Sequence, residues 1–525
     1  MKRTTLSLFA VTAALAAVTG VAALTAPSGG SGSGGGTGTA AKQPARLPVQ
    51  RSALLCPVPT SSDVAETTYT AFTPAGSGGA ARTPADLLPA AAPAGGTRPD
   101  AKDGKDSKDG KGSKKKTDEK AAPDKPVLSL KEPGRPVTAG TDRSDAPALI
   151  GTADGPLAPG WTVQQTTTVS AGSGRGLHGL SCTAPDTSFW FPGVSTAKSR
   201  QDYVHLTNPD SSAAVVDLEL YGADGRVQSA TGEGVTVPPR STLPVLLSTL
   251  TSAPADDLTL HVAARSGRVG AAVQAADEKT GGDWLPSAGE PAKSLVLPGI
   301  PADATSVRLV AFAPGPDDAD LKVRLAGASG SISPAGHESL HVKGGMTAAV
   351  DLGDLTRGEA GSLLLTSQGG DAGGGSPVTA ALRVTRGKDD KQETAFIPAT
   401  PAIEVRGTAA DNRDRSSTLY LTAPGKEAQV KVTASAGSDG GTPVTKTYTV
   451  KAGATLAVEP PQPAGGKGGY ALTVEKVSGG EVHAARMLAL PKDGVPMFTI
   501  QPIPDDRSTV AVPEARPDLS LLTRR

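Results

Sequence analysis

The sequence predicts an all-β chain of tandem immunoglobulin-like β-sandwich domains, preceded by a disordered N-terminal region. Three observations carry this prediction. Apolar and polar residues alternate along many short segments, as they do in half-buried strands. One motif recurs at intervals of roughly 105 residues, which is close to the length of one sandwich. The composition agrees, because 64 Gly and 45 Pro suit short strands joined by turns, whereas only 3% of the residues are aromatic.

The alternation is clearest in residues 214–221. Val216, Leu218 and Leu220 fall on one face of the predicted strand. Asp217 and Glu219 fall on the other face, which we expect to point away from the core. An Asp-Gly pair follows and favours a hairpin turn, because glycine accepts a positive φ angle. A shift of one residue in the pairing register of the strand would point its charged side chains into the core, so the register is well specified.

The recurring motif is a strand and a turn, followed by a second strand that begins Val-x-Ala-Ala. It occurs at Val269, Val378 and Val482, and an aromatic residue follows each copy about 15 to 18 residues later. The interval is too long for a solenoid repeat. We therefore expect the three valines to occupy equivalent positions in three sandwiches of one topology.

The N-terminus has the pattern of an export signal. Lys2 and Arg3 precede an uncharged, mostly apolar run at residues 6–26. The run is also about long enough to span a bilayer, so cleavage and retention as a single-pass anchor both stay open. We expect an extracytoplasmic protein that is either secreted or tethered to the cell membrane by this segment.

A long stretch near the N-terminus is expected to lack order. Residues 75–101 are rich in Ala, Pro and Gly, and residues 102–120 hold eight lysines and five acidic residues without an apolar side chain. Such a segment buries too little surface to offset the entropy of ordering it. Its excess of positive charge is small, which favours a solvated loop over a basic arm for polyanions.

These signals divide the chain into seven parts. They are a signal peptide or single-pass anchor at 1–27, a flexible linker at 28–46, an N-terminal β unit at 47–185 with a disordered insertion at 75–125, β-sandwiches at 186–290, 291–400 and 401–510, and a tail at 511–525.

The sequence contains two cysteines, Cys56 and Cys182. In an exported chain a pair of cysteines normally bonds, so we expect a disulfide between them. Closing such a long loop stabilises a fold by about 4–5 kcal/mol in the chain-entropy model. A zinc site is disfavoured, because it requires four closely spaced ligands.

The histidines form no metal-binding or catalytic motif. His205, His261 and His483 fall in strand patterns, at positions expected to face solvent. His337 and His341 are four residues apart, but they lie in a Gly/Ser-rich region that does not predict a helix. We therefore assign no catalytic, cofactor-binding or metal-binding residue, and we expect no cofactor.

Two other residue types could serve carbohydrate chemistry. Adjacent aspartates at 256–257, 317–318 and 505–506 could form a glycosidase pair, but their Pro/Gly/Ala-rich surroundings predict turns. Exposed tryptophans could form a sugar-stacking platform, whereas their neighbouring prolines favour packing at strand edges. The tryptophans are Trp161, Trp190 and Trp284.

Several short motifs, taken in order, resemble a family of secreted actinobacterial proteins known as a domain of unknown function. The motifs are Cys56-Pro57, Cys182 followed by Trp190-Phe191-Pro192-Gly193, Leu206-Thr207-Asn208-Pro209, Val237-Pro238-Pro239, Ser266-Gly267-Arg268-Val269 and Trp284-Leu285-Pro286. The resemblance runs from about residue 47 to the C-terminus. It implies an envelope-associated protein and brings no catalytic residues.

The function that follows is a non-enzymatic cell-envelope scaffold or interaction protein on the extracytoplasmic side. The alternative is a carbohydrate-binding protein that acts on cell-wall glycans. The expected partner is an envelope protein or a glycan. Nucleic acid is not expected, because Lys+Arg and Asp+Glu both number 52 and a neutral chain offers no field to attract it.

Overall fold

The structure, a computed structural model, describes residues 45–76, 81, 83–91, 125–369 and 374–512. The predicted export segment, most of the linker, residues 92–124 and most of the tail lie outside these residues. Within the described part, regular structure consists of strands β1–β36 and three short 3-10 turns. No helix in this part has the length and apolar character that crossing a membrane requires.

The strands fall into four consecutive groups. The first comprises β2 (Arg51–Cys56), β3 (Ala65–Phe72), β4 (Ala85–Pro89), β5 (Leu128–Leu130), β6 (Val137–Thr141), β7 (Leu149–Asp154), η1 (Gly155–Leu157), β8 (Thr162–Val169) and β9 (Gly176–Ser181). The second comprises β10 (Ser188–Val194), β11 (Arg200–Thr207), β12 (Ala214–Gly222), β13 (Gly225–Arg226), β14 (Val235–Val237), β15 (Thr242–Leu246), η2 (Leu247–Thr249), β16 (Leu258–Ser266), β17 (Gly270–Asp277) and β18 (Gly281–Leu285).

The remaining two groups follow the same plan. The third comprises β19 (Ser294–Ile300), β20 (Ala304–Phe312), β21 (Ala319–Gly327), β22 (Gly330–Ile332), β23 (Ser339–Val342), β24 (Thr347–Asp351), β25 (Gly361–Gln368), β26 (Thr379–Arg386), η3 (Asp389–Lys391) and β27 (Glu393–Pro398). The fourth comprises β28 (Arg406–Asn412), β29 (Ser417–Ala423), β30 (Ala428–Gly437), β31 (Val444–Val450), β32 (Ala454–Val458), β33 (Tyr470–Gly479), β34 (His483–Ala489) and β35 (Phe498–Ile503).

Each group is one β-sandwich of two antiparallel sheets, and the described residues form four such sandwiches with one strand order. In the first, the sheet β2-β7-β4-β5 is paired with the sheet β6-β3-β8-β9. The fourth repeats this order with β28-β33-β30-β31 and β32-β29-β34-β35. The second and third sandwiches have the same strand order, but two short strands take the place of the fourth strand: β13 and β14 in the second, and β22 and β23 in the third. The all-β sandwich prediction is therefore confirmed.

The recurring valines occupy equivalent positions, as the motif predicts. Each lies directly before the seventh strand of its sandwich, which is β17, β26 or β34. Each also bonds through its backbone to the segment that opens the sandwich: Asp186 with Val269, Ala292 with Val378, and Ile403 with Val482. All three valine side chains are buried in the core of their own sandwich.

The first sandwich is a fourth copy that the motif does not predict. Its seventh strand, β8, carries Gln164 and Gln165 in place of small apolar residues. The expectation of disorder is wrong for Ala85–Pro89, which form β4 and pair with β7. Ala85 and Leu87 alternate along this short strand and are each 1% exposed in the core, so even an Ala/Pro-rich stretch supplies one buried face.

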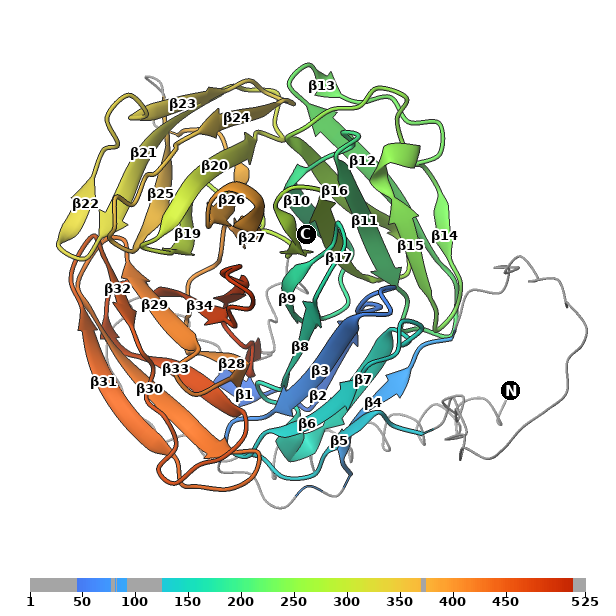
Figure 1. Cartoon of the computed structure of the whole chain (residues 1–525), viewed down its shortest axis with the longest axis vertical. Coiled ribbons are helices and arrows are strands. Elements are labelled where there is room, and N and C mark those ends of the chain that lie inside the picture. The colour runs from blue at the N-terminus through green and yellow to red at the C-terminus, as the bar shows by residue number, and fades with distance from the viewer. Residues whose placement is uncertain (1–44, 77–80, 82, 92–124, 370–373, 513–525) are drawn as a thin grey trace, which may run out of the picture. The chain divides into compact units, whose positions relative to one another are not determined.

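Within the compact unit Arg46–Val510, the sandwiches contact one another in a closed cycle. The eighth strands β9, β18, β27 and β35 meet where the four sandwiches converge, and Figure 1 labels β9 and β27 in this region. Strand β9 contacts β18 and β35, and β27 contacts the same two strands. The fourth sandwich therefore packs against the first, and the eighth strands are covered by neighbours on both sides.

Cys56 and Cys182 are joined by a disulfide, with their Cα atoms 4.6 Å apart and 126 residues between them in sequence. The bond links the end of β2 to the residue that follows β9, so it ties the first strand of the first sandwich to its last. Both cysteines belong to the core of that sandwich. Outside the sandwiches, β1 (Ala45–Pro48) and β36 (Thr509–Val512) pair in a two-stranded sheet.

Candidate functional site

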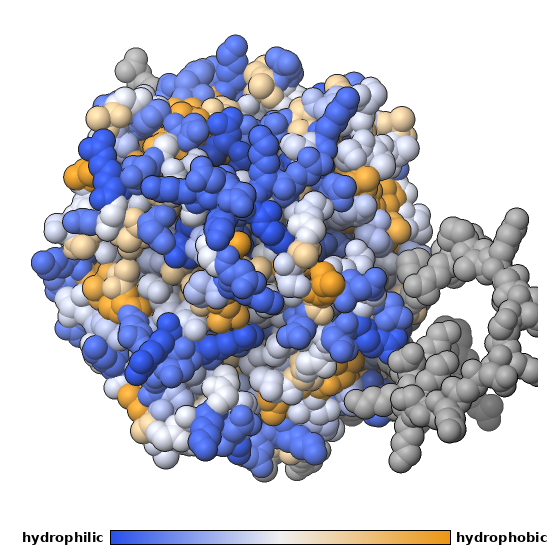
Figure 2. Space-filling model, in the orientation of Figure 1, coloured by the Kyte–Doolittle hydropathy of each residue, from blue (hydrophilic) through white to orange (hydrophobic). Residues whose placement is uncertain are grey.

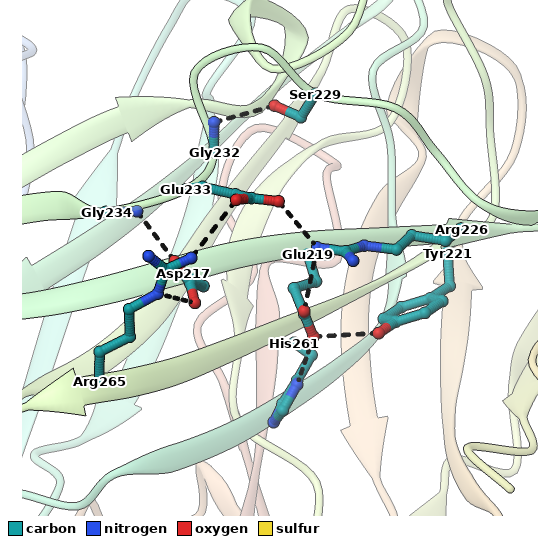
Figure 3. Close-up of polar contacts among 10 residues, drawn as sticks. All are labelled: Asp217, Glu219, Tyr221, Arg226, Ser229, Gly232, Glu233, Gly234, His261 and Arg265. Atoms are coloured by element: carbon teal, nitrogen blue, oxygen red, sulfur yellow. Dashed lines mark hydrogen bonds and ion pairs between the residues drawn. The ribbon is translucent and has the colours of Figure 1, made fainter.

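The most organised polar surface lies on the outer side of the sheet β10-β16-β12-β13 in the second sandwich. Strand β12 sends Val216, Leu218 and Leu220 into the core, where each is at most 2% exposed. Asp217 and Glu219 point to the opposite side (Figure 3), as the sequence alternation predicts. The site is built on a rigid strand, because every second residue of β12 is fixed by packing.

A cross-strand row runs through the middle of this surface. His261 on β16 lies opposite Glu219 on β12 and opposite Trp190 on β10. Its Nδ1 atom is 3.0 Å from Glu219 Oε2, and its ring stacks on Trp190 at a centroid distance of 3.8 Å. Glu219 also accepts a hydrogen bond from the hydroxyl of Tyr221 at 3.0 Å and pairs with Arg226 at 3.1 Å.

A second row lies beside the first. Arg265 on β16 pairs with Asp217 at 2.6 Å, and Asp217 also accepts the backbone N–H of Gly234 at 2.8 Å. Glu233 bridges the rows, because it lies 3.4 Å from both Arg226 and Arg265. We call the seven residues of the two rows the charged face. They are Asp217, Glu219, Tyr221, Arg226, Glu233, His261 and Arg265.

The surroundings of Asp217 and Glu219 favour their ionised forms. Burial disfavours ionisation of Glu219, but the hydrogen bonds from His261 and Tyr221 and the charge of Arg226 outweigh it and lower its pKa. The pKa of Asp217 is lowered in the same way against burial, by the N–H of Gly234 and by Arg265. Burial and the hydrogen bond to Glu219 raise the pKa of Tyr221 to about 12, so its hydroxyl stays a donor.

The rim of the charged face is open to water. The side chains of Arg226, Arg265 and Glu233 are 49%, 53% and 60% exposed. Exposed pairs of this kind add little stability, so they are free to exchange partners with a ligand. Tyr221 marks the edge of the face, since its ring packs 4.6 Å from Phe312 of the third sandwich.

The tryptophans do not form a sugar-stacking platform. Trp161, Trp190 and Trp284 are 5%, 9% and 1% exposed, respectively. Trp161 lies in the core of the first sandwich, whereas Trp284 packs with Leu180 and Ala272 between the first and second sandwiches. The platform interpretation is therefore wrong for these three residues, because neighbouring strands cover their rings.

Two of the histidines predicted to face solvent are buried. His205 is 6% exposed and His483 is 7% exposed, and only His261 stays partly open. His205 points away from the core of its own sandwich, but it meets the edge of Trp284 at a centroid distance of 5.2 Å. His483 Nδ1 lies 2.8 Å from the Thr400 carbonyl of the third sandwich. Strand alternation identifies the outer face of a sheet but not whether another sandwich covers it.

Of the other residues considered for chemistry, His341 and Asp318 come together, whereas Asp257 and Asp506 pair with arginines. His341 lies between Asp320 and Asp318, with contacts of 2.8 and 3.4 Å from its two ring nitrogens. Asp257 forms an ion pair with Arg308. Asp506 forms one with Arg406 at the end of the fourth sandwich. Among the described residues no group of three or more His, Cys, Asp or Glu side chains could hold a metal ion.

Sequence reasoning identifies the acids of β12 but misses their partners. Arg226 and Glu233 come from the hairpin segment after β12, and Arg265 comes from β16, more than 40 residues along the chain from Asp217. No local pattern marks these three residues as a group. The pairing of β12 with β13, β14 and β16 brings them together.

Comparison with known proteins identifies a family. The model of a family of unknown function (DUF5719) matches residues 137–461, which is more than half of the chain. The match begins in the first sandwich and extends through β32 of the fourth. The chain belongs to this family. No curated protein sequence matches it.

Proposed function

We propose that this member of the DUF5719 family is a non-enzymatic scaffold or interaction protein of the cell envelope, and that it acts on the extracytoplasmic side of actinobacterial cells. The observation that carries the proposal is the Cys56–Cys182 disulfide, buried in the core of the first sandwich. Disulfides persist in oxidising compartments and are rare in the cytoplasm. The charged and apolar runs at the N-terminus of the sequence support export as well.

The charged face is the proposed contact surface for the partner. It presents three acids and two arginines on one side of the sandwich. Asp217 and Glu219 are held at the centre by several contacts, whereas Arg226, Arg265 and Glu233 form exposed pairs at the rim. Preorganised groups lose little entropy on binding. The surface seen in Figure 2 is largely hydrophilic, with apolar residues in small separate patches. Such a surface suits a polar partner that is recognised by charge and hydrogen bonding.

Envelope binding tests this role. We expect the purified chain to bind saturably to cell envelopes from a strain that lacks the gene, and the double variant R226E/R265E to bind roughly tenfold more weakly. Both arginines are half exposed, so the fold should tolerate the change. A matched control is K426E/K451E, which reverses two exposed lysines in the fourth sandwich. Co-sedimentation supplies the binding curves.

The outcomes separate the candidate partners. Loss of binding after protease treatment of the envelopes indicates a protein partner. Loss after digestion with a wall hydrolase indicates the alternative, a cell-wall glycan. Equal weakening by both double variants, or the absence of saturable binding, contradicts the assignment of the charged face.

A further inference from the structure

Two buried carboxyl groups lie where the four sandwiches converge, apart from the charged face. Asp283 belongs to β18 of the second sandwich and is 0% exposed. Glu393 belongs to β27 of the third sandwich and is 1% exposed. Acidic side chains are almost never buried this fully without a charged partner, so the contacts of each require an account.

Glu393 joins three sandwiches through one oxygen atom. Its Oε1 accepts the backbone N–H of Leu177 in the first sandwich at 2.8 Å, and that of Phe498 in the fourth at 3.3 Å. Since Glu393 itself belongs to the third, this side chain connects β27 to β9 and β35. Both N–H groups are buried and would otherwise lack an acceptor.

Asp283 makes the matching connection to the first sandwich. Its Oδ1 accepts the N–H of Gly179 on β9 at 2.9 Å and that of Trp284 on its own strand at 2.7 Å. Strand β9 is closely packed at this point, because a Cβ atom on Gly179 would lie only 2.5 Å from Thr499 of the fourth sandwich. The glycine therefore allows the strands to approach.

The second oxygen of each carboxyl group has no partner among the described residues. Asp283 Oδ2 and Glu393 Oε2 are both buried and have no partner within ordinary hydrogen-bond distance. The hydroxyl of Thr499 lies near Asp283 and opposes the rise in its pKa, but it does not outweigh burial. A carboxyl group that lost its proton here would hold a negative charge away from water without an ion-pair partner, which is costly. A protonated carboxyl group avoids that cost and keeps the Oδ1 and Oε1 acceptors for the N–H groups.

The cations around the pair donate their hydrogen bonds to other groups, although the charges of Arg175 and Arg386 still lower the pKa of Glu393 in part. Arg175 donates to the carbonyl groups of Lys279, Asp390 and Gln392, and Arg386 pairs with Asp303. Lys391 donates to the Asp493 carbonyl, and Arg486 to Gln164 and Gln501. His178 lies near Gly282 and bonds to Gly174, and burial lowers its pKa to about 4, so it is neutral near pH 7.

The titration behaviour agrees with this geometry. Burial raises the pKa of Glu393 to about 7, against the opposing hydrogen bonds from Leu177 and Phe498. Burial also raises the pKa of Asp283 well above its ordinary value, and the charge of Glu393 raises it further. A carboxyl group whose pKa is raised on folding stabilises the fold at low pH, and that stabilisation is lost as the pH rises. For Glu393 the loss falls between pH 4.5 and about 7.

We infer that Asp283 and Glu393 form a pH-sensitive latch that holds the four sandwiches together in mildly acidic medium and loosens as the pH rises to neutrality and above. The latch goes beyond the proposed binding role and does not depend on it. Strands β9 and β35 are the elements that we expect to loosen, because their backbone N–H groups donate hydrogen bonds to the two carboxyl groups.

Thermal unfolding and amide exchange of the full chain test the latch between pH 5 and pH 8.5. We expect the melting temperature of the wild type to fall across this range. We also expect the Leu177 and Phe498 amides to lose protection at least tenfold after correction for intrinsic exchange. The E393Q variant keeps the accepting oxygen and cannot ionise, so its melting temperature and protection should vary much less with pH.

Exposed Glu359 supplies the control, and E359Q should behave like the wild type. D283N is the second variant if E393Q fails to fold, and it should also weaken the pH dependence. Two results overturn the inference: wild-type protection at Leu177 and Phe498 that is the same at pH 5.5 and pH 8, or an undiminished pH dependence in a folded carboxyl variant.

Discussion

Replacing Cys56 and Cys182 together by serine is expected to lower the free energy of unfolding by about 4 kcal/mol, because the reduced chain regains the entropy of a loop of 126 residues. The serines also leave buried hydroxyl groups in an apolar core. Urea unfolding at pH 6, followed by fluorescence, measures the loss. Reduction of the wild-type protein should reproduce most of it.

The wild type and the double serine variant should unfold alike once a reductant is present. If the two differ by several kcal/mol under reducing conditions, the serine hydroxyl groups rather than the missing bond cause the loss. Equal stability of the oxidised wild type and the variant contradicts the expected role of the disulfide.

Replacing Arg486 by alanine is expected to lower the free energy of unfolding by about 3–5 kcal/mol. This arginine on β34 is 0% exposed, and its guanidinium donates to Gln164 of the first sandwich at 2.9 Å and to Gln501 on β35. Alanine removes both contacts and leaves a cavity where the fourth sandwich meets the first. Burial lowers the pKa of Arg486 to about 10, so the group keeps its charge at neutral pH.

The R486M variant is the matched control for that substitution. Methionine fills much of the same space without a charge, and two of the guanidinium nitrogens, Nε and Nη1, have no partner among the described residues. We therefore expect R486M to lie within about 1–2 kcal/mol of the wild type. If R486M is as unstable as R486A, the hydrogen bonds to Gln164 and Gln501 contribute more than the packing.

Local patterns predict the sandwiches well. The alternation of Val216, Leu218 and Leu220 with Asp217 and Glu219 gives both the core face and the outer face of β12, and the structure confirms it. Period-two alternation works because side chains of a strand point to opposite sides whatever lies beyond the sheet. The Val-x-Ala-Ala motif also predicts correctly, because its valine occupies one position in the core of a single sandwich and does not depend on the neighbouring sandwiches.

Contacts between sandwiches cannot be predicted in this way. His483 lies at the contact with the third sandwich, and the ring of Trp284 covers His205 from within the second sandwich. No feature of the strands that carry these histidines indicates that they are buried. Glu393 follows a charged turn and has the local sequence of an exposed residue, but closure of the cycle buries it. The Val-x-Ala-Ala motif does not identify the first sandwich as a fourth copy, because Gln164 and Gln165 of its β8 strand stand in place of small apolar residues.

The redox state of Cys56 and Cys182 in living cells tests the proposed extracytoplasmic location most directly. Cells that make the protein are quenched in acid and alkylated, and the peptides are mapped by mass spectrometry without reduction. The proposal predicts one linked pair of peptides that contain Cys56 and Cys182, with little alkylation of either residue. Recovery of both cysteines as alkylated thiols would place the chain in a reducing compartment and contradict the account.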